Sequence, residues 1–172
     1  MVNKEKDKKI DAEATGQMES SSEMHHHDLN HKGGHMSIGA QYVKDLSFEN
    51  PRAPLSLVNA KNKPSIDLRV DAVAHKIQGD TYEVAVHIVA KAVVDKADAI
   101  FLCDLTYCGL FTLIKVPEKE REFALLVHGA NSLYPFARRI VADLTRDGGF
   151  PTLMLDPIDF GQVYARKKEA KK

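Results

Sequence analysis

The chain has 172 residues, 44% of them hydrophobic, and its 24 basic residues balance its 24 acidic ones. This length is sufficient for one domain with a hydrophobic core, and the neutral balance indicates neither a nucleic-acid binder nor a membrane-surface protein. No apolar run reaches the roughly 18 residues of a membrane span, and the start lacks the apolar stretch of a signal peptide, so we expect a cytoplasmic protein with no membrane insertion.

Residues 1–40 contain no aromatic side chain and few apolar ones. Such a segment buries too little apolar area to offset the entropy of ordering it, so we predict a disordered extension. It carries five histidines, three of them spaced by four: His25, His26, His27, His31 and His35. This spacing would align ligands on a helix, but Gly33 and Gly34 oppose one. We therefore expect adventitious Ni or Zn binding rather than a metal site.

The folded part is predicted to begin near Gln41. Residues 41–50 alternate, with Tyr42, Leu46 and Phe48 on one face and a largely polar opposite face. A period of two is typical of a strand that buries one face, so this segment is predicted to be the first strand.

Four further runs follow the strand pattern. They are a short one at 66–71, a long one at Thr81–Val94, and two apolar ones at 99–107 and 110–116. Gly109 separates the last two, and we expect a turn or a bulge there. Short turns between successive strands favour an antiparallel meander over parallel units with crossover helices.

From Glu118 the apolar period becomes helical. Two helices are predicted, divided near Pro135, because proline lacks the backbone N–H that a helix interior requires. A Gly-Gly pair ends the second of them, and a last short helix is predicted over 157–166. Strands followed by helices indicate an α+β fold with helices on one sheet face. The predicted boundaries are a disordered extension at 1–40, a folded domain at 41–165 and a basic tail at 166–172.

Two cysteines, Cys103 and Cys108, lie in the apolar strand runs. A hairpin at this point would make them neighbours, so a disulfide stays open, but buried free thiols are favoured. A nucleophilic thiol needs a pKa lowered by a histidine or a helix N-terminus. No local motif ties His75, His87 or His128 to either cysteine, so the pattern does not indicate an enzyme.

Strand parity places Asp45, Glu49 and Asp104 on the same outward side as Leu102. A solvated sheet face and an acidic docking patch with an apolar centre both fit, and the pattern alone favours the solvated face. The basic tail likewise fits a solvated end or a salt-sensitive contact with an acidic partner.

Five motifs occur in the order and with the spacing found in the SecB family of protein-export chaperones. They are YVKDLSFENP within 41–54, FLCD at 101–104, GLF at 109–111, LYPFAR at 133–138 and FPTLMLDPIDF at 150–160. Each motif alone is weak, but the five in order are specific. The chain resembles this family over residues 41–165.

The resemblance implies a four-stranded antiparallel sheet with two main helices on one face, and a homotetramer built as a dimer of dimers. It implies a chaperone that holds unfolded secretory precursors in the cytosol without ATP or a cofactor and delivers them to the SecA motor. The SecA-docking surface implied by motif match consists of Asp45, Glu49, Leu102 and Asp104. Asp104 stands where the family usually has Glu, which keeps the charge and shortens the reach by one methylene.

The resemblance also implies grooves for the unfolded client. Their apolar lining is implied at Phe48, Phe101, Cys103 and Phe160, with the loop at 53–64 as a flank. A chaperone that binds many sequences needs apolar surface and exposed backbone groups more than side-chain readout, because only these are shared by all unfolded chains.

Three alternatives stay open. One is a SecB-like chaperone dedicated to a single client, such as the antitoxin of a toxin–antitoxin pair. Another is a small thiol- or metal-dependent enzyme that uses Cys103 and a histidine, and the third is a passive oligomeric scaffold.

Overall fold

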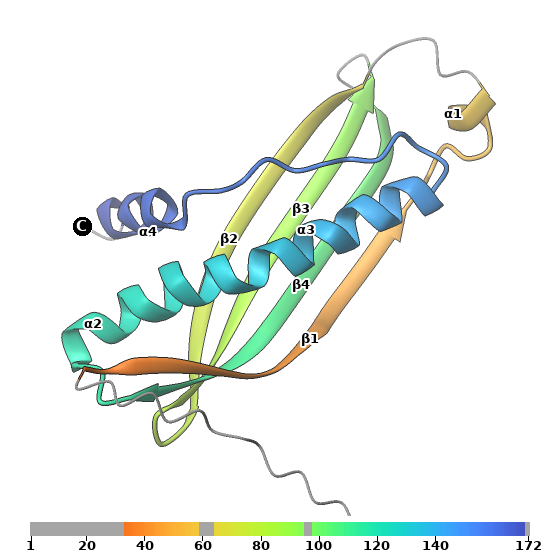
Figure 1. The fold of residues 1–172 in the computed structure, drawn as a ribbon. Coiled ribbons are helices and arrows are strands. Elements are labelled where there is room, and N and C mark those ends of the chain that lie inside the picture. Colours follow the sequence, from red (N-terminus) through yellow and green to blue (C-terminus); the bar gives the residue numbers. More distant parts are fainter. Residues whose placement is uncertain (1–32, 59–63, 95–97, 171–172) are drawn as a thin grey trace, which may run out of the picture. The chain divides into compact units, whose positions relative to one another are not determined.

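The computed structural model describes residues 33–58, 64–94 and 98–170 (Figure 1). Four long strands form one antiparallel sheet in the order β1-β4-β3-β2. Their bounds are β1 His35–Glu49, β2 Ser65–Gln78, β3 Thr81–Val94 and β4 Asp98–Ile114. The prediction of a four-stranded antiparallel sheet with helices on one face is confirmed, and β3 has the predicted bounds.

Two strands are longer than predicted. The first strand begins at His35, so residues 35–40, which we assigned to the disordered extension, belong to the sheet. They pair with the end of β4, from His35 opposite Ile114 to Ile38 opposite Phe111, which compensates for their weak apolar pattern. Strand β2 runs over 14 residues rather than six, because it pairs with β3 along almost its whole length.

The predicted turn or bulge at Gly109 is wrong, because β4 passes straight through this residue. Gly109 pairs with Val84 of β3 without a register shift. The irregularities occur in β1 instead, between Ile38 and Gln41 and between Val43 and Asp45. A bulge adds a residue to one strand only, so each of them shifts which side chains of β1 face the helices.

The bulge next to Val43 corrects the predicted parity of β1. Tyr42 pairs with Cys108, whereas Leu46 and Phe48 pair with Leu105 and Cys103. Cross-strand partners share a face, and residues 103 and 108 of one regular strand lie on opposite faces. Tyr42 therefore lies on the face opposite to that of Leu46 and Phe48.

A single helical rod covers one face of the sheet (Figure 1). It consists of α2 (Glu118–Phe123), a π-helical turn η1 (Ala124–Gly129) and α3 (Ala130–Asp147), which follow one another without a gap. The predicted division at Pro135 is wrong, since Pro135 lies inside α3 on its exposed side. Ser132 donates from its hydroxyl to the His128 carbonyl one turn earlier, at 2.9 Å. The buried side chains on the other side of the rod hold it against the sheet through this point.

After α3 the chain returns along the rod toward the last helix, α4 (Phe160–Glu169) (Figure 1). Two hydrogen bonds attach this returning segment to α3. The Thr145 hydroxyl accepts from the Leu153 N–H at 3.0 Å, and the Tyr134 hydroxyl donates to the Asp156 carbonyl at 2.7 Å.

Helix α4 begins three residues later than predicted, where the Asp159 carboxylate accepts a hydrogen bond from the Gln162 N–H. It extends through most of the predicted basic tail, and Lys167 forms an ion pair with Asp71 of β2 at 2.9 Å. The short α1 (Leu55–Val58) lies in the connection from β1 to β2. No helix within the described ranges is long and apolar enough to cross a membrane.

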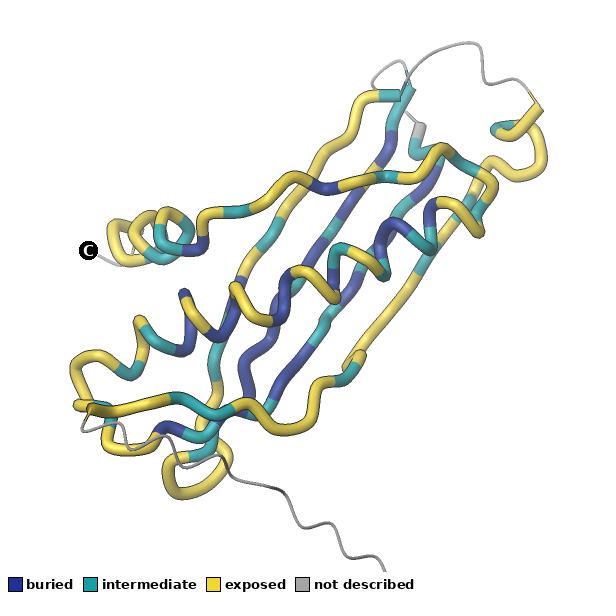
Figure 2. The backbone as a smooth tube through the Cα atoms, in the orientation of Figure 1, coloured by how far each residue is buried: buried dark blue, intermediate teal, exposed yellow. Residues whose placement is uncertain are grey.

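The core lies between the sheet and the helical rod. Figure 2 shows the central strands β3 and β4 largely buried and the edge strands β1 and β2 largely exposed. The largest fully buried side chains come from β3, β4, α3 and the start of α4 and include Ile88, Leu105, Phe111, Leu133 and Phe160. The helices thus occupy one face of the sheet and leave the other, which we call the outer face, without a described helix on it.

Candidate functional site

The outer face brings together the four residues of the predicted docking surface. Glu49 of β1 pairs with Leu102 of β4, and Ser47 of β1 pairs with Asp104. Asp45 lies one pair further along, opposite Thr106. Asp45, Glu49, Leu102 and Asp104 therefore lie on one face of two adjacent strands, and we call them the docking patch.

The docking patch is small and open to solvent. Asp45 and Glu49 are exposed, and Leu102 and Asp104 are partly exposed. A strand rises about 3.3 Å per residue, so the patch extends about 13 Å along β1. Three carboxylates around one apolar side chain within this span can accept two or three cationic groups of a partner and an apolar contact between them.

One residue of this surface was not predicted from the sequence. His87 of β3 lies with its Nε2 2.7 Å from Oδ1 of Asp104, and both side chains are about half exposed. His87 is paired with Thr106, so its contact with Asp104 is a diagonal one across the sheet. Strand parity alone gives the face of a residue but not its register against another strand, so no signal in the sequence pointed to this pair.

A second polar cluster lies further along the outer face. Glu83 of β3 is only 7% exposed, and its carboxylate accepts hydrogen bonds from the Tyr42 hydroxyl and, at 2.6 Å, from Lys44 Nζ. The hydrogen bonds from Lys44 and then Tyr42 lower the pKa of Glu83. The hydrogen bond to Glu83, followed by burial, raises the pKa of Tyr42 to about 12.

The Glu83 cluster accounts for the burial of Cys108. Strand β4 lies between β1 and β3, so side chains that connect Tyr42 and Lys44 with Glu83 pass over Cys108, which pairs with Tyr42. Cys108 is fully buried, and burial raises its pKa to about 11.

The two cysteines are free, and the possibility that a hairpin brings them together is wrong. They lie five residues apart on the single strand β4, which places their side chains on opposite faces. Burial likewise raises the pKa of Cys103 to about 11. A thiol with a raised pKa is mostly protonated near neutral pH, which is the opposite of what a nucleophile requires.

The four predicted client-binding residues lie on the helix side of the sheet. Phe48 is partly exposed, and its ring stacks on Phe101 at a centroid distance of 5.7 Å. The Phe101 ring in turn packs against the Phe150 ring at a centroid distance of 5.1 Å. Phe101 is 3% exposed, and Cys103 and Phe160 are fully buried, so in this conformation these three belong to the core rather than to an open groove.

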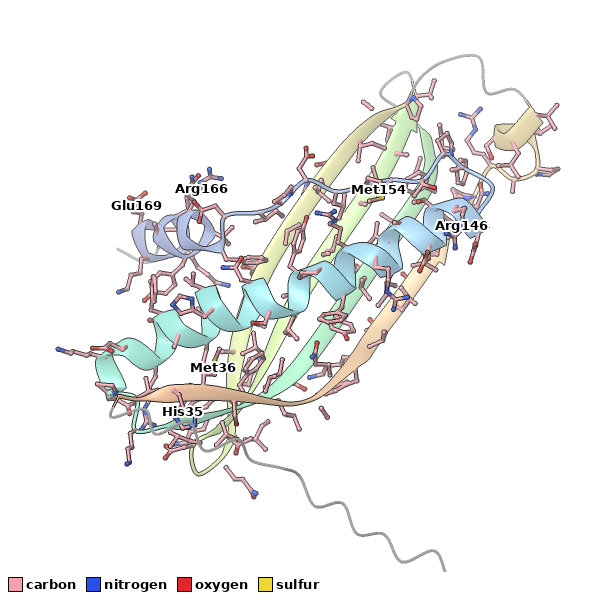
Figure 3. The ribbon with its side chains drawn as sticks, viewed as in Figure 1. His35, Met36, Arg146, Met154, Arg166 and Glu169 are labelled. Atoms are coloured by element: carbon pink, nitrogen blue, oxygen red, sulfur yellow. The ribbon has the colours of Figure 1, made fainter. Side chains whose placement is uncertain are left out.

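Exposed apolar residues on the helix side were not singled out in the sequence. Leu55 and Val58 of α1 are 65% and 78% exposed, and Met154 of the returning segment is 62% exposed. Figure 3 shows Met154 on this segment, alongside α3. Two residues of the edge strand β2, Ile66 and Leu68, are also exposed. Scattered exposure of this kind has no sequence signature, because an exposed leucine and a buried one look alike in a pattern.

The predicted adventitious metal binding rests mainly on His25, His26, His27 and His31, which lie outside the described residues. His35 is part of β1 (Figure 3). Over the ranges that the structure describes, no group of three or more His, Cys, Asp or Glu residues is placed to hold a metal ion.

Comparison with known proteins identifies the family. The family model described as "Preprotein translocase subunit SecB" matches residues 30–171. The chain belongs to the SecB family. It is 49% identical over 134 residues to the protein-export protein SecB of Parvibaculum lavamentivorans, with 78% of this chain and 79% of the relative covered. The SecB of Maricaulis maris is 50% identical over 75% of this chain and 74% of the relative, and that of Rickettsia bellii is 43% identical over 81% and 92%.

A solved structure shares the fold. It is a SecB-like chaperone of Mycobacterium tuberculosis in complex with a peptide from the HigA1 antitoxin. The TM-score is 0.60 at 19% identity, and the match covers 72% of this chain and 90% of that one. SecB membership, rather than this distant likeness, therefore carries the functional argument.

Proposed function

We propose that this SecB-family chaperone of protein export holds unfolded secretory precursors in the cytosol without ATP and delivers them to the SecA motor. The observation that carries the delivery step is the assembly of Asp45, Glu49, Leu102 and Asp104 into one exposed patch on the outer face. Carboxylates at this spacing attract a basic segment of a partner and fix its register, while Leu102 supplies an apolar contact.

The client surface lies on the opposite side of the sheet. Its exposed apolar residues come from α1, from β2 and from the segment after α3, and they include Leu55, Val58, Ile66, Leu68 and Met154. An unfolded chain offers apolar side chains and unpaired backbone groups, so apolar surface and a free strand edge suit many sequences. Weak contacts at several such places add up once one client spans them.

Phe101, Cys103 and Phe160 contribute to this surface in a conformation in which part of the helix layer moves aside. Phe48 is the most accessible of the four predicted groove residues, and it lies beside Gly148 at the end of α3. The aromatic cluster of Phe48, Phe101 and Phe150 is therefore the part of the core that such a movement would expose first.

We further propose a homotetramer built as a dimer of dimers. The edge strand β1 has exposed apolar side chains, Ile38, Val43 and Leu46, along a backbone edge that pairs with no other described strand. Exposed edges of this kind favour pairing with another strand, and in a symmetric dimer the same strand of a second copy is the natural partner. Exposed aromatic rings on the helical rod, Phe123 and Phe136, offer a second apolar contact.

Because the docking patch and the client surface lie on opposite faces, charge reversal in the patch should affect SecA binding alone. Asp45→Lys or Glu49→Lys should weaken SecA binding about tenfold, because like charges across an interface are unfavourable, and should leave client binding and assembly unchanged. The matched control is Asp67→Lys, which makes the same charge change on β2 of the outer face, two strands from Leu102 and three from Glu49. SecA binding is measured by calorimetry, and client binding by light scattering after size exclusion with an unfolded precursor.

A mass near four chains that increases with unfolded precursor, but not with native protein, supports the holdase. A chain that ignores unfolded precursors contradicts it, and so does one that binds native protein equally well, as a passive scaffold would. If Asp67→Lys weakens SecA binding as much as Asp45→Lys does, the docking patch is wrong.

One rival function has a specific observation behind it. The fold is shared with a SecB-like chaperone solved in complex with an antitoxin peptide. A chaperone dedicated to one client would select that client over unrelated unfolded precursors. Its affinity for SecA would not change with a substitution at Asp45. Competition between two unrelated precursors for the same chaperone separates the two functions.

A further inference from the structure

We propose that His87 is a further residue of the docking surface and controls the charge that Asp104 presents to a basic partner, so that docking weakens as the pH falls. The inference deepens the proposed SecA docking and rests on it. It starts from the short contact between His87 Nε2 and Asp104 Oδ1, 2.7 Å across the outer face.

The charge that Asp104 presents to a partner differs between the two charge states of the imidazole. A neutral His87 with its proton on Nε2 donates one hydrogen bond, and Asp104 keeps its full negative charge and a second oxygen for a partner. A protonated His87 forms an ion pair that neutralises Asp104 and adds a positive charge in the same row as Asp45, with Thr106 of β4 between them. The two states differ by one positive charge next to Asp104, and solution pH is the variable that interconverts them.

Other charged groups face His87, but the nearest ones are engaged elsewhere. Asp71, its cross-strand partner on β2, forms an ion pair with Lys167 of α4 at 2.9 Å. Glu83, four residues earlier on β3, binds Lys44. The remaining charged groups around it are Arg69 on β2, Lys91 on β3, and Asp45 on β1.

The accessibility of both side chains makes the pair part of the surface rather than of the core. The His87 and Asp104 side chains are 45% and 41% exposed, so a partner cation that approaches Asp104 also meets the imidazole. Exposed charge pairs contribute little because solvent screens them, so the expected change in SecA affinity on protonation is about two- to fivefold.

The test compares wild type, His87→Gln and His87→Arg at about pH 8 and about pH 6. Binding of purified SecA is measured by calorimetry at low ionic strength, about 50 mM, where screening is weak. Wild type should lose about two- to fivefold in affinity at the lower pH. Gln donates a hydrogen bond but does not titrate, so His87→Gln should bind as wild type does at the higher pH and lose less at the lower one. His87→Arg, charged at both pH values, should bind weakly at both.

The matched control is His75→Gln, which removes another exposed histidine of the outer face. His75 lies on β2, opposite Glu83 of β3. The SecA affinity of His75→Gln should change with pH as that of wild type does. This comparison also accounts for any groups of SecA itself that titrate in the same range. If His87→Gln keeps that dependence too, the inference is overturned. Failure of the docking proposal is distinct, because Asp45→Lys would then leave SecA binding unchanged at either pH.

A synthetic Lys/Arg-rich peptide serves as a second probe. Its affinity should follow the same order among the three His87 forms at both pH values. A peptide that binds His87→Arg as well as it binds wild type at about pH 8 would contradict charge control by His87.

Discussion

At the scale of single residues, one extra residue in β1 determines which face of the sheet Asp45 and Glu49 occupy. Ordinary alternation places Tyr42 and Lys44 on the outer face, where both bind Glu83. The bulge between Val43 and Asp45 then returns Asp45 to that same face. Beyond the bulge the strand resumes its alternation, which sets Asp45 and Glu49 into the docking patch. The Glu83 cluster and the docking patch thus lie on the same face because of this irregularity.

Glu83→Gln should lower the free energy of unfolding by about 1–2 kcal/mol near neutral pH. The physical reason is that a glutamine cannot form the charged hydrogen bond with Lys44, and bonds to charged groups are stronger than neutral ones. Urea unfolding at fixed protein concentration measures the change. Asp67→Asn, which removes an exposed carboxylate from the same face, should change it by less than about 0.5 kcal/mol.

The difference between wild type and Glu83→Gln should also depend on pH. The pKa of Glu83 lies below its ordinary value of 4.5 in the folded chain, so its contribution is present above that value and is lost as the pH falls through the folded pKa. The gap between the two proteins should therefore shrink below about pH 4.5. A gap of constant size down to acid unfolding would show that the carboxylate charge is not what stabilises the cluster.

At the scale of elements, the crossing of the helical rod over β4 depends on a residue without a side chain. A Cβ on Gly109 would lie 2.8 Å from Leu133 Cδ2 and 3.0 Å from Phe111 Cε2. Leu133 and Phe111 are both buried in the core, so neither can move away easily. Gly109 therefore serves the close approach of α3 to the sheet, rather than the turn that its sequence context indicated.

Gly109→Ala should lower the free energy of unfolding by about 1–3 kcal/mol, the usual range for overpacking a core. Gly39→Ala is the matched control, since a Cβ there meets nothing closer than 3.6 Å. Thermal and urea unfolding of the two variants give the comparison. Equal stabilities for the two variants would mean that α3 and β4 can separate at no cost.

The elements that the sequence predicted well are those whose pattern is local. Apolar residues occupy every second position of β3 from Val84 to Ala92, and the bounds of this strand were predicted to the residue. The predictions failed where a local rule met a tertiary contact. Pro135 would end an isolated helix, but the buried side of α3 holds the rod together through it, and Gly109 would weaken an isolated strand, but it makes room for Leu133.

The same distinction applies to the candidate site. Parity in the sequence placed Asp45, Glu49, Leu102 and Asp104 on one side, and the structure has them on one face of adjacent strands. The contact of His87 with Asp104 depends on the register between β3 and β4, which no single strand encodes. The burial of Cys103 and Phe160 depends on the position of the helix layer. The alternation of a single strand does not predict that position either.

At the scale of the whole molecule, the sheet separates two kinds of surface. The outer face carries charge and one apolar residue in a defined patch, whereas the helix side carries exposed apolar residues on several elements. A chaperone that must hold a client while it docks on a motor needs both surfaces at once, and a sheet between them lets each be changed without the other.

The sheet also buries one thiol on each face, and this gives a prediction for the stability of the whole chain. Burial raises the pKa of both Cys103 and Cys108 from an ordinary value of 9.0 to about 11. A raised folded pKa means that the stabilisation is complete below the unfolded value and is lost as the pH rises toward the folded one. The free energy of unfolding should therefore decline between about pH 9 and about pH 11, by at most about 2–3 kcal/mol for each thiol.

Urea unfolding under reducing conditions across this pH range measures the decline. Other groups, Tyr42 and the lysines among them, titrate at the upper end of the range, so the comparison with Cys103→Ala and Cys108→Ala isolates the thiols. Each variant should start less stable than wild type near neutral pH, because a small cavity replaces the sulfur, and should then lose less as the pH rises. Removing both thiols should give the flattest profile, since the two lie on opposite faces and act independently. A double variant whose stability declines as steeply as that of wild type would show that the thiols stay protonated until the chain unfolds for another reason.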